Sequence, residues 1–443
     1  MSKTDKTDKT DKTEKTQAEA LSSTGLTRRN AIMGTAATLA AFKAAFPGGA
    51  HAAGGGPETA KAKLGFIALT DSSPLIIAKE RGLFAKHGMP DVEVLKQASW
   101  GATRDNLVLG SERGGIDGAH ILSPMPYLMT TGAITGGAPT PMYVLARLNT
   151  NGQGISVGND LKAVKVGLNS SGAKAKFAQL KASGNIAKVA MTFRGGTHDL
   201  WVRYWLAAGG INPETDVSTL VIPPPQMVAN MKAGTQDVFC VGEPWNGQLV
   251  NQKVGYTACL TSELWMNHPE KALGMRAAWV DKYPRAAKAI TAAVQEAAMW
   301  CDKASNLPAM CSIVSGRQYI NVPMGDILPR LQGTVDYGDG RTLKNSPHRM
   351  KFWADNASFP FKSHDLWFLT EDIRWGVLPQ KTNTAALVNK VNRSGIWRAA
   401  AKLIGQSGPA GDSRGVERFF DGKVFDPANP GAYLASQPIK KLV

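Results

Sequence analysis

From residue 61 onward, apolar runs of strand length alternate with segments that have a helical pattern. The run over residues 63–69 is followed by a segment in which Asp71, or one of the two serines after it, is suited to cap a helix. Pro74 then suits the first turn of that helix. The alternation continues to about residue 148. It predicts right-handed strand-helix-strand units and a parallel sheet with helices on both faces, which is the α/β class.

The stretch NTNGQGISVGND, residues 149–160, separates this first unit from a second one. Its Gly and Asn residues are typical of a crossover between two lobes. The alternation then restarts, and the apolar runs expected to form strands cover residues 163–169, 187–193, 217–223 and 238–242. We therefore expect two α/β lobes of similar design.

The remainder of the chain is mostly helical in pattern beyond about residue 272, and it becomes irregular and rich in Trp and Pro after about residue 340. We expect residues 59–150 to begin lobe I and residues 151–271 to form lobe II. Residues 272–443 should complete lobe I and add a C-terminal wrap. Two lobes joined in this way form a cleft, and ligands of open α/β sheets bind beyond the carboxyl ends of the strands.

The front of the chain has the pattern of an export signal. Residues 1–25 are polar, partly repetitive and too poor in apolar side chains to fold. The pair Arg28 and Arg29 precedes a weakly apolar stretch that ends in a small-x-small cleavage pattern. A lysine and a proline interrupt that stretch, which argues against a membrane anchor. We expect residues 1–53 to be a twin-arginine signal with a polar N-terminal extension, and the mature protein to reside in the periplasm.

The charge balance favours an anionic partner but not a nucleic acid. Without residues 1–53 the chain has 43 Lys and Arg against 30 Asp and Glu, a net charge of +13. A basic protein attracts anions in general. No dense Lys/Arg cluster with interleaved aromatic residues occurs, so binding of DNA or RNA is not expected.

Sequence patterns of known catalytic sites are scarce. The chain has no GxSxG, HExxH or P-loop motif, and no GxGxxG at a strand-to-helix turn. The seven histidines form no i, i+4 pair, and the four cysteines form no CxxC. Cys301 and Cys311 could form a bridge in an oxidising compartment, whereas Cys240 in VFCVG is expected to be a buried thiol. We therefore expect capture of a solute rather than catalysis, with no cofactor and no metal.

The segment GGTHDLWVRYWL, residues 195–206, is expected to border the cleft. Gly195 and Gly196 permit close approach of the backbone, Thr197 suits an N-cap, and an apolar stripe follows. His198 would then lie in the first turn of a helix, where free N–H groups and the helix dipole favour an anion. A hydrogen bond from His198 to its own loop is the alternative.

Several ordered blocks, among them FRGGTHDLWVRYWLAAGGINP, CVGEPWN and NHPEKALGMRAAWVDKYP, resemble the nitrate and bicarbonate binding proteins of bacterial ABC transporters. The resemblance runs from about residue 59 to the C-terminus. It implies the type II periplasmic binding protein fold, in which the ligand is held between two lobes. The protein would then be a solute-binding component that passes nitrate or nitrite to permease and ATPase subunits, and we expect it to be a monomer.

The resemblance also implies the ligand-binding residues, which are Trp100 in QASWGATRDN, Gln153 in NGQG, His198 in GGTHDLW and Lys271 in HPEKALGMR, with Pro224 and Val241 lining the pocket. Each residue has a structural alternative. The tryptophan could pack within a lobe, the glutamine could belong to a crossover turn, and the lysine could be a solvated surface residue. The proline and the valine could be wall or core residues.

Lys271 bears on the choice of anion. In the bicarbonate branch of the family, the resemblance implies an acidic residue that works with calcium at this position, so a lysine here favours nitrate or nitrite. Because Glu270 is the preceding residue, the distinction depends on the alignment. A bicarbonate-binding protein of the same family is therefore one alternative. A nitrate sensor of the same fold and an exported enzyme are the others.

Overall fold

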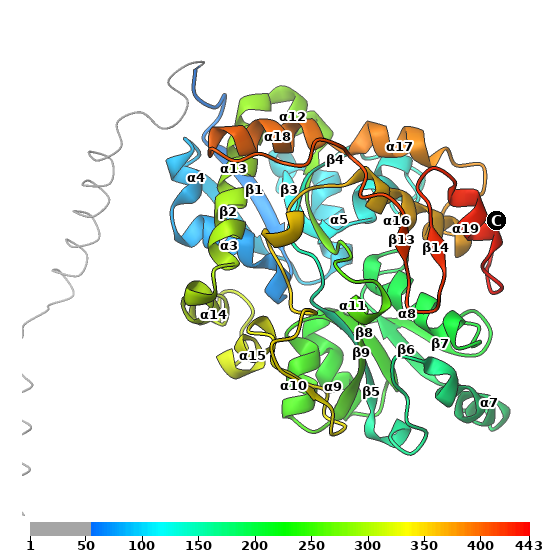
Figure 1. Ribbon diagram of the computed structural model, residues 1–443. Helices are drawn as coiled ribbons and strands as arrows, with labels where there is room; N and C mark the ends of the chain where they lie inside the picture. The colour runs from blue at the N-terminus through cyan, green and yellow to red at the C-terminus, as the bar shows by residue number, and fades with distance from the viewer. Residues whose placement is uncertain (1–54) are drawn as a thin grey trace, which may run out of the picture. The chain divides into compact units, whose positions relative to one another are not determined.

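The structure, a computed structural model, describes residues 55–443 (Figure 1). The export signal expected over residues 1–53 lies outside the described residues. Two five-stranded sheets form the centres of two lobes. Within residues 55–443, no helix has the length and apolar character that a membrane span requires.

The first sheet has the strand order β2-β1-β3-β10-β4. Its strands are β1 (Lys61–Phe66), β2 (Asp91–Lys96), β3 (Gly118–Leu122), β4 (Met142–Arg147) and β10 (Lys271–Arg276). β1 pairs in parallel with β2 and β3, whereas β10 lies antiparallel between β3 and β4. The chain thus leaves this sheet after β4 and returns to it through β10. We call this sheet and the helices packed on it the first lobe.

The second sheet has the order β7-β6-β8-β5-β9. Its strands are β5 (Gln153–Gly158), β6 (Lys188–Met191), β7 (Ser218–Val221), β8 (Val238–Gly242) and β9 (Gly255–Leu260). β6 is parallel to β7 and β8, and β5 is antiparallel to β8 and β9. This sheet and its helices form the second lobe. Both sheets are mixed: the expected parallel pairing is confirmed for β2-β1-β3 and β7-β6-β8, and it is wrong for the strands that complete each sheet.

One strand of the second lobe was expected in the wrong place. Residues 163–169 form turns in which only Val166 is buried, so they have little apolar surface to gain from joining the sheet. The strand is β5, formed by the Gly-rich crossover segment. Its residues Ile155 and Val157 are fully buried, and both neighbouring strands hydrogen-bond to it. The burial of this alternating pair outweighs the turn-forming character of the surrounding Gly and Asn residues.

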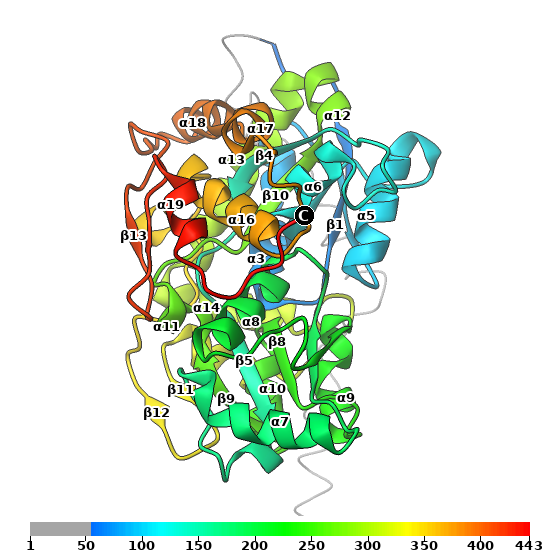
Figure 2. The same ribbon diagram turned by 90° about the vertical axis from the view of Figure 1, so that its right-hand side faces the viewer.

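Helices cover both sheets (Figures 1 and 2). Those that follow first-lobe strands are α3 (Ser73–Glu80), α4 (Leu83–Lys86), α5 (Trp100–Leu109) and α6 (Met125–Thr131). Those of the second lobe are α7 (Lys174–Ala182), α8 (Thr197–Ala208), α9 (Met227–Lys232), α10 (Trp245–Asn251) and α11 (Thr261–Leu264). After β10 come α12 (Ala277–Lys282), α13 (Pro284–Cys301), α14 (Leu307–Val314) and α15 (Leu328–Leu331).

The C-terminal part of the chain contacts both lobes. It contains α16 (Lys362–Arg374), α17 (Thr384–Val391), α18 (Ser394–Leu403) and α19 (Pro430–Ala435), with two short hairpins, β11–β12 (Val335–Asp336, Thr342–Leu343) and β13–β14 (Glu417–Arg418, Val424–Phe425). α16 packs against α8 of the second lobe, and α18 packs against β4 and α13 of the first (Figure 2). Trp367, Trp375 and Phe419 of this region join the hydrophobic core of the second lobe.

The four cysteines are buried free thiols, so the structure has no bridge between Cys301 and Cys311. Burial raises the pKa of Cys311 to about 12 and holds that of Cys240 well above its usual value. The expectation of a buried thiol at Cys240 is confirmed. A thiol that is both buried and protonated is a poor nucleophile and reacts slowly with oxidants.

Gly118 is required by the close contact of β3 with β10. A Cβ atom at this position would lie 2.0 Å from Met275 Sδ and 2.9 Å from the Gly274 carbonyl oxygen. We expect Gly118→Ala to lower the free energy of unfolding by about 1–3 kcal/mol, because the core around this strand must shift. Gly395→Ala in α18 meets no atom within 4 Å and is the matched control. Urea unfolding of both variants checks the prediction, and equal stability of the two would contradict it.

Candidate functional site

The two lobes meet at a group of polar side chains that we call the interlobe cluster. It consists of the fully buried residues Asp71, His120, Gln153, His198, Glu270 and Lys271. The second lobe supplies two of them, each at the start of an element: Gln153 opens β5 and His198 lies in the first turn of α8. The other four come from the first lobe, so the cluster lies where the carboxyl end of one sheet faces the other lobe.

Asp71 connects most of the cluster. It lies in the short 3-10 helix Thr70–Ser72 (η1) that links β1 to α3. Its Oδ1 accepts a hydrogen bond from His120 Nε2 at 2.6 Å, and its Oδ2 accepts from Lys271 Nζ at 2.9 Å and from Gln153 Nε2 at 3.1 Å. Burial alone would raise the pKa of Asp71, but the charge of Lys271 and the contact with His120 hold that pKa well below its usual value. The carboxylate is therefore ionised.

Lys271 is the only cation of the interlobe cluster. Its ammonium group lies 2.9 Å from Asp71 Oδ2 and 2.9 Å from Glu270 Oε1, and 5.9 Å from the ring centre of Trp100. Burial lowers the pKa of Lys271, but the two carboxylates outweigh burial and raise it. The alternative of a solvated surface lysine is excluded, because the residue is fully buried.

His198 is held from both sides of its ring. Nδ1 lies 2.5 Å from Thr192 Oγ1, and Nε2 lies 2.6 Å from Gln153 Oε1. Because the amide oxygen of Gln153 can only accept, Nε2 must carry the proton. Burial, reinforced by the charge of Lys271, lowers the pKa of His198 well below its usual value, so the ring is neutral. The expectation that this residue lies in the first turn of a helix is confirmed.

Thr197 does not cap α8 as expected. Gly196 is the N-cap residue, and Thr197 is the first residue of the helix. Its hydroxyl donates instead to Glu270 Oε1, while Trp201 Nε1 donates to Glu270 Oε2 at 3.0 Å. Burial raises the pKa of Glu270 in spite of the nearby ammonium of Lys271. Glu270 thereby links the first lobe to the start of α8 by two hydrogen bonds.

Trp100 begins α5 and lies fully buried against the cluster. Its ring contacts that of His120 with a centroid distance of 5.3 Å. Among residues 55–443, its indole Nε1 has no hydrogen-bond partner. A buried N–H group without an acceptor is rare, and it often marks a place that a ligand or a water fills.

The structure does not bring all six expected residues into polar contact. Trp100, Gln153, His198 and Lys271 lie together in or against the interlobe cluster. Pro224 is buried in the short 3-10 helix Pro224–Gln226, and Val241 is buried in β8, where its carbonyl accepts from Asn246. Neither side chain has a polar group, so neither takes part in the hydrogen bonds of the cluster, and their place in the pocket wall stays a prediction.

The roles of Asp71, His120 and Glu270 were not found from the sequence. The position of Asp71 suggests only a helix cap, and Glu270 stands out only as the neighbour of Lys271. His120, at the end of the strand pattern GAHIL, could face the cleft, although a loop or core position is the more common role of such a histidine. The one local signal is that Asp71 and His120 each stand at the carboxyl end of an apolar strand pattern. Gly242 is a further requirement, since a Cβ there would lie 2.9 Å from Gln153 Oε1 and 3.2 Å from Asp71 Oδ2.

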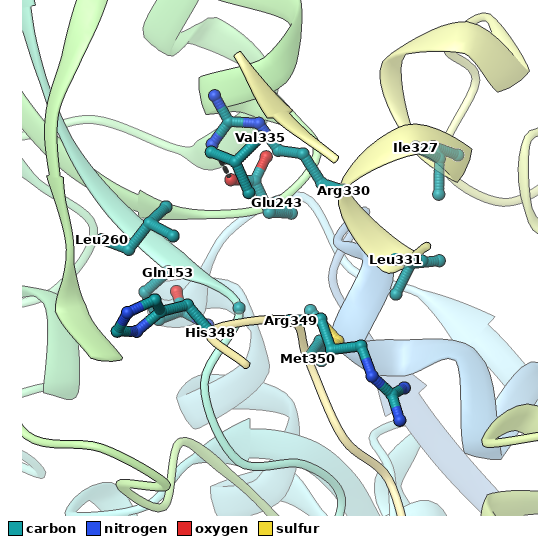
Figure 3. Close-up of a pocket in the computed structure, with 11 residues that line it drawn as sticks. Gln153, Glu243, Leu260, Ile327, Arg330, Leu331, Val335, His348, Arg349 and Met350 are labelled. Carbon is teal, nitrogen blue, oxygen red and sulfur yellow. Dashed lines mark hydrogen bonds and ion pairs between the residues drawn. The ribbon is translucent and has the colours of Figure 1, made fainter. Parts of the chain in front are cut away.

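A small cavity of about 20 Å³ is lined in part by Gln153 (Figure 3). The salt bridge between Glu243 and Arg330, 2.7 Å long, and the side chain of Met350 contribute to its wall. This volume is enough for about one water molecule, which needs at least about 10–15 Å³. In the described part of the chain, no group of three or more His, Cys, Asp or Glu side chains is arranged to hold a metal ion.

Comparison with known proteins places the chain in a family. The family model described as NMT1-like matches residues 55–315. The chain belongs to the NMT1-like family. The nitrate/nitrite binding protein NrtA of Synechococcus elongatus is 62% identical over 392 residues, which are 88% of this chain and 88% of the relative. The bicarbonate-binding protein CmpA of Synechococcus elongatus is 44% identical over 396 residues, 87% of this chain and 88% of the relative.

The NMT1-like chain also matches a solved structure over the whole length of that structure. The crystal structure of the periplasmic nitrate-binding protein NrtA from Synechocystis matches with a TM-score of 0.84 and 59% identity, and the match covers 87% of this chain and 100% of that chain. The expected two-lobed periplasmic binding fold is confirmed. The resemblance to transporter binding proteins that we stated from the sequence is confirmed as well.

Proposed function

We propose that this NMT1-like protein is the solute-binding component of an ABC importer and captures nitrate, or nitrite, between its two lobes. The observation that carries the proposal is the identity of 62% with the nitrate/nitrite binding protein, against 44% with the bicarbonate-binding protein. The bicarbonate alternative is therefore less well supported. The captured anion would be delivered to a membrane permease driven by ATPase subunits, with the binding protein acting as a monomer.

The interlobe cluster has donors suited to a planar monovalent anion. Nitrate is a weak base and undergoes no proton transfer, so it requires several donors and a nearby cation. We propose Lys271 as the cation, His198 Nε2–H and the amide of Gln153 as donors, and the free indole N–H of Trp100 as a fourth. Pro224 and Val241 would contribute to the wall of the pocket.

Binding must exchange existing hydrogen bonds. In the structure, Lys271 and Gln153 already donate to the carboxylate of Asp71, and His198 donates to Gln153. A carboxylate is planar, trigonal and singly charged, as nitrate is, so Asp71 occupies donors that the anion would use. Opening of the lobes would separate Gln153 from Asp71 and so release the amide donor of Gln153. The Lys271–Asp71 and His198–Gln153 hydrogen bonds each lie within one lobe, so the anion itself would have to replace them.

A thermal-shift experiment with four ligands tests the proposed function. We expect nitrate and nitrite to raise the melting temperature, because a ligand that binds only the folded state stabilises it. Bicarbonate with calcium and an alkanesulfonate should have much smaller effects. Stabilisation by the sulfonate alone would show that the nitrate assignment is wrong, and stabilisation by bicarbonate with calcium alone would favour the second branch of the family.

The cellular location of the protein distinguishes a transport protein from a sensor. Periplasmic relatives support a periplasmic location, and we propose that the twin-arginine pathway exports the protein. Replacement of Arg28 and Arg29 by lysine should leave the full-length precursor in the cytoplasm, whereas the unaltered chain should appear in the periplasmic fraction. Accumulation of the unaltered chain in the cytoplasm would favour the sensor.

Trp100→Phe tests the contribution of the indole N–H. The substitution keeps an aromatic ring against His120 but removes a donor that has no partner within the described protein. We expect nitrate binding to weaken about tenfold, which corresponds to the loss of one hydrogen bond of about 1.4 kcal/mol. The free energy of unfolding should fall by about 1–2 kcal/mol, because phenylalanine is smaller than tryptophan and leaves a small void at this fully buried position. Calorimetric titration and urea unfolding measure the two quantities, and unchanged affinity would remove Trp100 from the ligand shell.

A further inference from the structure

The interlobe cluster has more negative than positive charge, which disfavours the entry of an anion. Asp71 and Glu270 are both within 2.9 Å of the single ammonium group, that of Lys271. With both carboxylates ionised and the histidines neutral, the cluster carries a net charge of −1. Entry of a monovalent anion would bring the total to −2 in a cleft whose side chains are fully buried. Such an excess of buried charge is strongly unfavourable unless a proton neutralises part of it.

The hydrogen bonds around the histidines keep His120 and His268 neutral. His120 Nδ1 accepts from the Ile67 backbone N–H at 3.4 Å, so only its Nε2 carries a proton, which is donated to Asp71. His268 donates from Nδ1 to the Pro269 carbonyl and lies with Nε2 2.7 Å from Thr261 Oγ1. Burial lowers the pKa of both rings, that of His268 to about 3. Neither ring is suited to take up a proton near neutral pH.

Glu270 is the group best placed to accept a proton. Its Oε1 lies 2.9 Å from Lys271 Nζ and 3.5 Å from His198 Nε2, so it faces the proposed anion donors directly. The other ionisable groups around it are His268, with Nδ1 3.8 Å from Glu270 Oε2, the charged Asp71 beyond Lys271, and the thiol of Cys240 in β8. Asp71 and Glu270 each accept from Lys271 and from two neutral donors, which are His120 and Gln153 for Asp71 and Thr197 and Trp201 for Glu270. The charge of Lys271 and the contact with His120 nevertheless hold the pKa of Asp71 low, whereas burial raises that of Glu270, the carboxylate that faces His198.

We propose that capture of a monovalent oxyanion by the interlobe cluster is coupled to the uptake of one proton by Glu270. This inference rests on the proposed function. Protonation keeps the net charge of the cluster at −1 when the anion enters. It also weakens the hold of Glu270 on Lys271, which frees an ammonium proton for the anion, and it turns Oε1 from an acceptor into a donor. The Thr197 hydroxyl can rotate, so that contact survives the change.

The direction in which pH changes the affinity for nitrate follows from the pKa of Glu270. Burial already raises the pKa of Glu270 in the free protein, and an added negative charge raises it further in the complex. Binding is therefore favoured by low pH. Between the pKa of Glu270 in the free protein and its pKa in the complex, the Kd for nitrate should rise about tenfold per pH unit. Below both values, the Kd should not depend on pH.

The experiment measures proton uptake directly. Nitrate is added to the mature protein in unbuffered sodium chloride solution near neutral pH, and a pH-stat records the acid needed to hold the pH constant. We expect uptake of about one proton for each nitrate bound, as required to keep the cluster charge constant. Calorimetric titration over a series of pH values gives the Kd under the same conditions.

Two variants test whether Glu270 is the group that takes up the proton. Glu270→Gln keeps the size and a carbonyl acceptor but cannot be ionised, so it should bind nitrate without proton uptake and with a Kd that does not change with pH. Glu417→Gln is the matched control, since Glu417 also accepts from a tryptophan indole, Trp265 Nε1 at 2.8 Å, and pairs with Arg414 outside the cluster. It should retain the proton uptake of the unaltered protein.

The outcomes distinguish failure of the proton coupling from failure of the proposed function. Nitrate binding without proton uptake in the unaltered protein would overturn the coupling but leave the proposed function standing. Absence of nitrate binding at every pH would overturn both. Proton uptake that persists in Glu270→Gln would assign the proton to another group, for which His198 is the nearest candidate, and would overturn the role of Glu270. If Glu270→Gln does not fold, the pH-stat result for the unaltered protein still decides whether coupling exists.

Discussion

Replacement of Lys271 by glutamate is expected to abolish nitrate binding. The substitution removes the only cation of the interlobe cluster and places a third carboxyl group beside Asp71 and Glu270. An incoming anion would then meet only negative or neutral groups in a buried cleft. Removing one partner of a buried ion pair costs about 3–5 kcal/mol, so the free energy of unfolding should fall as well. Calorimetric titration with nitrate and urea unfolding measure the two effects.

Two further variants separate binding from folding. Lys271→Met keeps the length of the side chain without its charge, and we expect it to fold more stably than Lys271→Glu while still failing to bind nitrate. The control variant Lys381→Glu makes the same change of charge at an exposed lysine, and it should leave nitrate binding intact. If Lys271→Met binds nitrate as tightly as the unaltered protein, Lys271 is not the cation that the anion requires.

Loss of the buried ion pair between Arg147 and Asp365 is expected to have the largest effect on stability alone. Arg147 ends β4 of the first lobe, and its guanidinium group bonds to Asp365 of α16 and to Ser123 Oγ at 2.8 Å. Both charged side chains are fully buried. Arg147→Met leaves the Asp365 carboxylate with the amide of Asn392 as its remaining donor. We expect the free energy of unfolding to fall by about 3–5 kcal/mol.

A double-mutant cycle gives the matched control for this prediction. Asp365→Asn in the Arg147→Met background removes the uncompensated charge, so the double variant should be more stable than Arg147→Met. Urea unfolding of the single and double variants gives the coupling energy. Nitrate affinity should change little, because neither residue belongs to the interlobe cluster. Additive effects of the two substitutions would contradict the importance of the pair.

Much of the fold could be predicted from local patterns. Helix α8 formed where the sequence indicated it, with His198 in its first turn, and the strand runs before and after it became β6 and β7. Such elements depend on side-chain periodicity and on nearby capping residues, which are properties of contiguous sequence. The antiparallel strands β5 and β10 were harder to find. Their partners come from distant parts of the chain, and β5 lies in a segment with the composition of a loop.

The candidate site, like the fold, could be predicted only in part from the sequence. Trp100, Gln153, His198 and Lys271 were identified through a resemblance between ordered sequence blocks, and the structure brings them together. Asp71 and Glu270 were not recognised as part of the site, although they are the groups that hold Lys271. A carboxylate next to a lysine in the sequence reveals neither its burial nor its charge state. Both depend on which side chains the other lobe supplies.

By itself, the sequence determined the α/β class, the two-lobed plan and four of the residues that converge between the lobes, because these follow from local periodicity and from ordered blocks of matching sequence. Only the tertiary structure decided how the charges combine. Asp71 and Glu270 both come within hydrogen-bond distance of Lys271 when β10 inserts between β3 and β4. In a buried site, Coulomb interactions are weakly screened, so this placement sets the protonation of each group and thereby the conditions under which an anion can enter.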